Sequence, residues 1–263
     1  MNGELHHIIL ITSYTNALLN QGILSEPEAY TNNVHYAVRF IEPHERKSLL
    51  KFFSKPANNE FDTLKWMQNI KDRHCKGAFL INSNKIKDEA VTSAFVGGGR
   101  RWAIVCVFEH FNEIWVPNWN LAKEPPNTKW DITYTKVISY DEYKSVKYNL
   151  DDLSQRLRIA LSNISKLAEE ISEMGWKERF FDKGIKCLIG EQAEEKNLLP
   201  EHYPVSAQRI MNTISCSWVF GGMGSWNDSP PYSAHCHGKE MEYHKYTNEL
   251  YECMMGECGC VDL

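Results

Sequence analysis

Two neighbouring apolar runs near the middle of the chain indicate the central strands of a sheet. The first, residues 101–108, is apolar at both odd and even positions, a pattern typical of a strand that is buried on both faces. Four residues, 109–112, separate it from the second run at 113–117, a length that suits a hairpin loop. Pro117 cannot donate to a strand ladder, so we expect it at an edge or an end. The two runs predict a hairpin at the centre of the sheet.

Shorter runs on either side of this hairpin predict the other elements of the N-terminal half. β-Branched and aromatic residues are concentrated in candidate strands at 34–41, 77–81, 91–96 and 130–138. Apolar residues at helical spacing predict helices at 5–20, 45–53 and 61–73, the first of which ends at Gly22. We expect the strand at 130–138 to pair with the hairpin.

After Tyr148 the apolar positions recur at steps of three and four residues, which indicates helices. The strongest signal predicts an amphipathic helix from Leu150 to Met174 that ends at Gly175. Three more helices are predicted. The first covers 176–189 and is ended by Gly190, and the last covers 239–254. Between them, a helix starts at Pro204, has an apolar face that reaches Trp218, and ends at 221–222.

This order of elements, with strands first and mostly helices afterwards, favours an α+β fold over a doubly wound parallel one. We expect a mainly antiparallel sheet around the central hairpin, about residues 91–138, packed against several helices, with a mostly helical C-terminal half. No flexible linker is evident in the sequence. A single domain covering 1–263 is therefore predicted, with a sheet-rich layer at about 1–148 and a helical layer at about 149–263.

Composition narrows the class of protein. The 263 residues are 43% hydrophobic, enough for one large core, and the net charge of -5 argues against broad nucleic-acid binding. No run of about 18 apolar residues occurs, and the N-terminus lacks a basic segment, so we expect neither a membrane span nor a signal peptide. Cys106 and Cys187 lie in apolar settings typical of reduced, buried thiols, which predicts a cytoplasmic protein.

The glycine-rich loop at 221–230 is the most unusual stretch of the sequence. Its glycines and the Asn227-Asp228 pair are typical of a tight turn. In one interpretation the loop is a structural connection, with Trp226 buried against the sheet or the long helix and its indole N–H paired. In the other, Trp226 and Asn227 contact a ligand or a partner.

The candidate catalytic residues of this region are Ser225 as nucleophile, Asp228 as orienting carboxylate, and His235 or His237 as base. The loop does not complete the Gly-x-Ser-x-Gly elbow of hydrolases, because Asn227 stands where the last glycine belongs. The glycines and arginines at 97–101 resemble a phosphate loop but precede a strand, whereas such loops lead into a helix. Both mismatches argue against an enzyme.

Candidate zinc ligands gather near the C-terminus. They are His235, His237, Cys253, Cys258 and Cys260. Thiolates and imidazoles are the ligands that zinc prefers. Their spacing matches neither paired Cys-x2-Cys nor the common finger arrangement. We therefore predict no cofactor and keep zinc as an alternative.

Trp102, Trp115, Trp119 and Trp130 bunch around the predicted hairpin. Such aromatic clusters most often belong to a core, because their rings carry much of the buried area. If Trp115 and Trp119 flank an open edge, they would instead anchor a partner protein.

The lack of a complete catalytic motif favours an intracellular interaction or accessory protein, of the immunity type, whose partner is another protein. The alternatives are an enzyme built on the 221–228 loop and a protein with a structural zinc in its tail. An exposed aromatic patch with no deep pocket would favour binding, whereas convergent buried polar groups beside Ser225 would favour an enzyme. The sequence gives no oligomeric state.

Overall fold

The computed structural model describes residues 3–26, 35–43, 59–82, 102–121, 130–140, 143, 148–192, 198–221 and 223–258. The predicted helix at 45–53, the predicted strand at 91–96, the glycine–arginine run at 97–101 and Cys260 lie outside the described residues.

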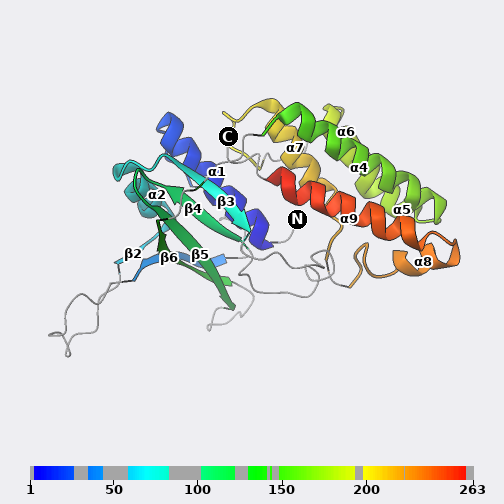
Figure 1. Ribbon diagram of the computed structural model, residues 1–263, viewed down its shortest axis with the longest axis horizontal. Coiled ribbons are helices and arrows are strands. Elements are labelled where there is room, and N and C mark those ends of the chain that lie inside the picture. Colours follow the sequence, from blue (N-terminus) through cyan, green and yellow to red (C-terminus); the bar gives the residue numbers. More distant parts are fainter. Residues whose placement is uncertain are drawn as a thin grey trace.

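The N-terminal half forms a six-stranded sheet in the order β2-β1-β6-β5-β4-β3 (Figure 1). Its strands are β1 (His35–Glu42), β2 (Asn59–Phe61), β3 (Gly77–Asn82), β4 (Trp102–Val107), β5 (Asn112–Leu121) and β6 (Trp130–Ser139). Neighbouring strands are antiparallel except for β1 and β6, which run parallel. With the helices that follow, this sheet confirms the predicted α+β class.

The predicted hairpin is confirmed as β4 and β5. Trp102 to Cys106 are all buried, so both faces of this strand are covered. Val107, its last residue, is half-buried. Pro117 lies inside β5 rather than at its end, because the strand continues to Leu121. The described pairing of β5 with β4 stops at Trp115, so Pro117 has β6 on one side only. The missing N–H of the proline is therefore tolerated where the strand is locally an edge.

The helices are α1 (Gly3–Gln21), α2 (Thr63–Asp72), α4 (Leu150–Glu170), α5 (Met174–Trp176), the π-helical segment η2 (Lys177–Phe181), α6 (Asp182–Ile189), α7 (Val205–Cys216), α8 (Pro230–Cys236) and α9 (Glu240–Glu257). Asp62 and Asn149 cap α2 and α4 by accepting hydrogen bonds from the first backbone N–H groups. Gly22 and Gly190, both at positive φ, end α1 and α6 as predicted.

Two predicted helix ends were wrong. α4 ends at Glu170 rather than Gly175, because Ser172 adopts a φ of 63° and the Glu173 N–H bonds the Ala168 carbonyl, closing the last turn. α7 ends at Cys216 rather than at 221–222, so Trp218 lies beyond the helix. The short helix α8 was not predicted, since two prolines open it in a stretch that resembles a loop.

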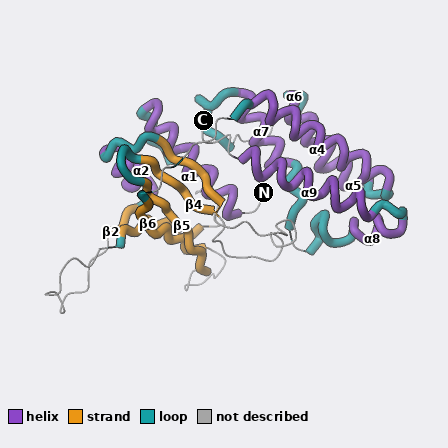
Figure 2. Tube along the Cα trace, viewed as in Figure 1, coloured by secondary structure: helices purple, strands orange, loops and turns teal. Residues whose placement is uncertain are grey.

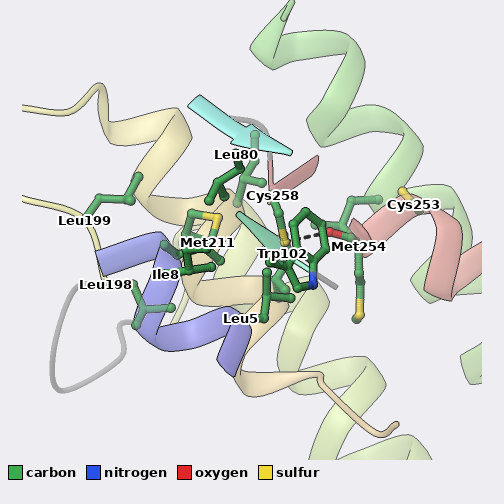
Figure 3. Packing of buried hydrophobic residues seen from close by; sticks show 14 of the residues in the cluster. Leu5, Ile8, Leu80, Trp102, Leu198, Leu199, Met211, Cys253, Met254 and Cys258 are labelled. Atoms are coloured by element: carbon green, nitrogen blue, oxygen red, sulfur yellow. Dashed lines mark hydrogen bonds between the residues drawn. The ribbon is translucent and has the colours of Figure 1, made fainter. Parts of the chain in front are cut away.

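α1 is the middle layer of the molecule, between the sheet and the C-terminal helices (Figures 1 and 2). It is buried almost all round, including polar residues that the amphipathic interpretation would place in solvent: His7, Thr12, Ser13, Thr15 and Asn16. A helix buried on all sides packs on both neighbouring layers. Figure 3 shows this arrangement, with Leu5 and Ile8 of α1 among apolar residues of both layers.

Candidate functional site

The glycine-rich loop is anchored by Trp226. Its side chain is 0% exposed, and its indole N–H donates to the Thr247 hydroxyl at 2.9 Å. The rings of Phe181 and Tyr243 lie 5.0 and 5.6 Å away, and the Tyr243 hydroxyl donates to the Trp226 carbonyl at 2.8 Å. The predicted burial and pairing of Trp226 are confirmed. Its ring neighbours come from the C-terminal helices and not from the sheet, which was one of the two surfaces predicted for it.

The candidate catalytic residues are engaged within their own turns. The Ser225 hydroxyl donates to the Gly221 carbonyl at 2.9 Å, and an Asp228 carboxylate oxygen accepts from the Gly224 N–H at 2.9 Å. His235 lies on α8, with its Nδ1 2.5 Å from a Glu240 carboxylate oxygen. Asn227 is half-buried and its backbone N–H bonds the Ser225 hydroxyl. These contacts stabilise two turns and do not join the three residues into a triad.

The candidate metal ligands fall into two environments. His235 and His237 are exposed at the end of α8, whereas Cys253 and Cys258 are buried in the apolar contacts of α9 and the turn after it. The Cys258 thiol donates to the Met254 carbonyl at 3.1 Å (Figure 3). Within the described ranges, no three His, Cys, Asp or Glu side chains are placed to hold a metal ion. Zinc binding by the tail stays an untested alternative.

One serine–histidine contact was not anticipated from the sequence. His237 Nδ1 lies 2.7 Å from the Ser233 carbonyl, which places its proton there and leaves Nε2 as an acceptor for the Ser172 hydroxyl at 3.4 Å. A nucleophile and base begin with such a pair. Both side chains are exposed, however, and water weakens the electrostatic stabilisation that catalysis requires. The contact is best explained as a link between the end of α4 and the end of α8.

The tryptophans around the hairpin belong mainly to the core. Trp115 is 0% exposed and meets Trp66 of α2 at 5.6 Å, edge to face. The prediction that the cluster belongs to the core is therefore confirmed for Trp115. Trp119 is half-buried, with its ring 5.3 Å from His7 and 5.9 Å from Trp130. These rings define the inner face of the sheet, the face covered by α1 and α2.

A four-residue ion network joins α2 to this inner face. Arg73 contacts Glu113 at 2.5 Å and Glu42 at 3.3 Å, while Lys136 contacts Glu42 at 2.9 Å and Glu113 at 3.3 Å. The Glu113 side chain is only 2% exposed, so its charge requires both cations. Two acids and two bases balance each other. The network therefore serves to fix α2 on the sheet rather than to bind a charged ligand.

The opposite, outer face of the sheet carries a row of apolar residues. Phe79 pairs with Val105, Val105 with Ile114 and Ile114 with Val137, so the row crosses four strands. Val105 is buried and Tyr143 covers Phe79 with its ring at 5.0 Å, but Val137 at the other end is 52% exposed. We call these four residues the apolar row.

A second line of side chains extends the same face beside the apolar row. Val116 pairs with Thr135, and Thr135 pairs with Ile41 on β1. All three are half-buried. Farther along β5, the same face presents the exposed amides of Asn118 and Asn120. The outer face thus has an apolar centre next to a polar margin, and sequence reasoning missed it because register across strands is not visible in a linear pattern.

Comparisons with models of protein families, with curated proteins and with solved structures found no match for this chain. None of the helices in the described part of the chain has the length and apolar character needed to cross a bilayer.

Proposed function

We propose that this is an accessory, immunity-type interaction protein that binds another protein through the outer face of its sheet. The observation that carries the proposal is the apolar row, which crosses four paired strands and ends at the 52% exposed Val137. Burial of such a surface against a partner removes apolar area from water and favours association.

The composition of the face supports this interpretation. An antiparallel sheet with one solvated face normally alternates apolar inward positions with polar outward ones. β5 departs from that rule, because the apolar Ile114 and Val116 face outward on either side of the inward-facing Trp115. Asn118 and Asn120 give the apolar centre a polar rim, which is the usual anatomy of a protein interface.

The other proposals have weaker support. The polar groups of the 221–228 loop are used in its own turns, which leaves Ser225 and Asp228 with structural roles. A cytoplasmic location is part of our proposal, and it is supported by the buried thiols of Cys106 and Cys187, which occupy apolar surroundings as small hydrophobic residues do.

Val137→Lys tests the proposal, with Val205→Lys as its matched control. Val205 is 63% exposed at the start of α7, so both variants place a lysine at an exposed valine. Tagged wild-type protein and both variants are purified from the native host, and the associated proteins are compared. We expect a partner that is retained by wild type and Val205→Lys and lost from Val137→Lys, with all three proteins melting at similar temperatures.

Two results would contradict the outer face as the binding surface: a partner that Val137→Lys retains in full, or one that Val205→Lys loses equally. Light scattering after size exclusion distinguishes a further case. If wild type is a dimer and only Val137→Lys is monomeric, the partner of the apolar row is a second copy of the chain.

A further inference from the structure

Two cysteines that are 29 positions apart meet where α6 packs on α7. The Cys216 thiol lies 3.3 Å from the Cys187 sulfur, and it also lies 3.4 Å from the Thr213 carbonyl. Cys187 is buried, with 2% of its surface exposed, whereas Cys216 at the end of α7 is partly exposed. We infer that these two residues are an oxidation site, at which a peroxide or a disulfide reagent produces a reversible disulfide between α6 and α7.

The contact follows from how closely the two helices approach. A Cβ atom on Gly184 would lie 2.9 Å from the Ser217 Cβ, closer than packed side chains tolerate, so only glycine fits there. One hydroxyl reinforces this approach, because Thr213 Oγ1 lies 3.4 Å from the Gly184 carbonyl. Gly184 precedes Cys187 by three residues, and Thr213 precedes Cys216 by three. The contact between Thr213 and Gly184 therefore lies one helical turn from the contact between the two sulfurs. The backbone geometry therefore brings the sulfurs together.

The distance is suited to disulfide formation. A disulfide has an S–S length of about 2.05 Å, so the sulfurs must approach by roughly 1.2 Å, which side-chain rotation can supply. The partly exposed Cys216 meets the oxidant first. With hydrogen peroxide, its thiolate attacks one oxygen and becomes a sulfenic acid, and hydroxide leaves and takes up a proton to give water. The Cys187 thiol then attacks the sulfenic sulfur, the S–S bond forms, and a second water is released.

The cross-link would fasten two helices of the layer that packs on α1. Gly184 of α6 also approaches Leu161 of α4, and Met211 of α7 belongs to the same buried cluster as Ile8 of α1 (Figure 3). The disulfide would thus restrain the helical layer from within. It closes a loop in the unfolded chain, so we expect the oxidised protein to melt at a higher temperature than the reduced one. This inference does not depend on the proposed function.

The experiment uses the native chain, treated with hydrogen peroxide or oxidised glutathione and then blocked with N-ethylmaleimide under denaturing conditions. Trypsin places Cys187 in the peptide 187–196, but Cys216 and Cys236 share the peptide 210–239. We therefore use the Cys236→Ser variant, in which a link between these two peptides identifies Cys216 unambiguously. We expect this link as the main product, and we expect dithiothreitol to remove it and to reverse the rise in melting temperature.

Single variants separate the pair from general thiol oxidation. Cys187→Ser should lose the cross-link and leave a sulfenic acid at Cys216 that dimedone traps. Cys236 is exposed on α8. The Cys236→Ser variant should form the 187–216 link to the same extent as wild type. A second digestion with chymotrypsin separates Cys216 from Cys236 in the wild-type protein and so allows this comparison. If the folded protein retains both thiols, or forms the link only after denaturation, the inference is wrong.

Discussion

Asn16 of α1 makes two hydrogen bonds with the backbone of Ala78 in β3. Its amide nitrogen donates to the Ala78 carbonyl at 2.8 Å, and its amide oxygen accepts from the Ala78 N–H at 2.9 Å. β3 is the last strand of the described sheet, and the side chain of Asn16 takes the place that another strand would occupy. α1 therefore covers an edge that would otherwise be open to association.

Asn16→Ala should destabilise the protein strongly. It leaves the buried N–H and carbonyl of Ala78 without these bonds, and each unsatisfied group costs about 1–3 kcal/mol. Urea unfolding measures the loss. Asn20→Ala, at an exposed position of the same helix, is the control and should change stability by less than about 0.5 kcal/mol. Equal effects of the two substitutions would contradict the role of Asn16.

Trp226→Ala should lower the free energy of unfolding by about 3–5 kcal/mol, the usual cost of removing a large buried ring. Thr247→Val removes the hydroxyl that accepts from the indole N–H and also hydrogen-bonds the Tyr243 side chain, and it should cost about 1–3 kcal/mol. Denaturant unfolding followed by circular dichroism gives both values. A small loss for Trp226→Ala would mean that the loop does not depend on this anchor.

The ion network predicts how stability depends on pH. Burial alone would raise the pKa of the Glu42 carboxyl, but the Lys136 hydrogen bond and charge, with help from Asn59 and Arg73, lower the pKa below its ordinary value of 4.5. A carboxyl with a depressed pKa stabilises the folded state above its unfolded pKa, and this contribution disappears as the pH falls through the folded pKa. Stability should therefore fall below about pH 4.5.

Glu42→Gln tests that pH dependence. The variant should be less stable than wild type at neutral pH, and the difference should shrink as the pH falls below the ordinary value of 4.5. Lys136→Met, which removes the main partner of Glu42, should shift acid unfolding to higher pH. Unfolding curves at a series of pH values provide the measurement, and parallel curves for wild type and Glu42→Gln would rule out the linkage.

The last prediction concerns zinc binding by the C-terminal tail, and the metal content of the purified protein tests it. Because the histidines are exposed and Cys253 and Cys258 are buried away from solvent, we expect less than about 0.1 equivalent of zinc after purification without a histidine tag. Elemental analysis measures it. About one equivalent of zinc, lost on substitution of Cys258, would establish a site that includes the tail.

Much of the secondary structure could be predicted, because it depends on local periodicity. The apolar run of β4 and the steps of three and four residues in α4 lie in continuous stretches, so the limits of β4 and the start of α4 were predicted nearly correctly. Helix ends were less predictable, since Ser172 adopts a backbone conformation that glycine usually supplies. The burial of Trp226 could also be predicted, because a large ring in a tight turn requires cover.

The sequence by itself determined the α+β class, the hairpin and the helical C-terminal half, since each depends on residues near one another along the chain. Only the tertiary structure decided which distant residues meet. Asn16 reaches Ala78 across 62 positions, Cys216 reaches Cys187 across 29, and Val137 joins the apolar row through the register of β6 on β5. The physical reason is that a one-residue shift in strand register reverses which face a side chain occupies, and helix rotation decides which residues touch.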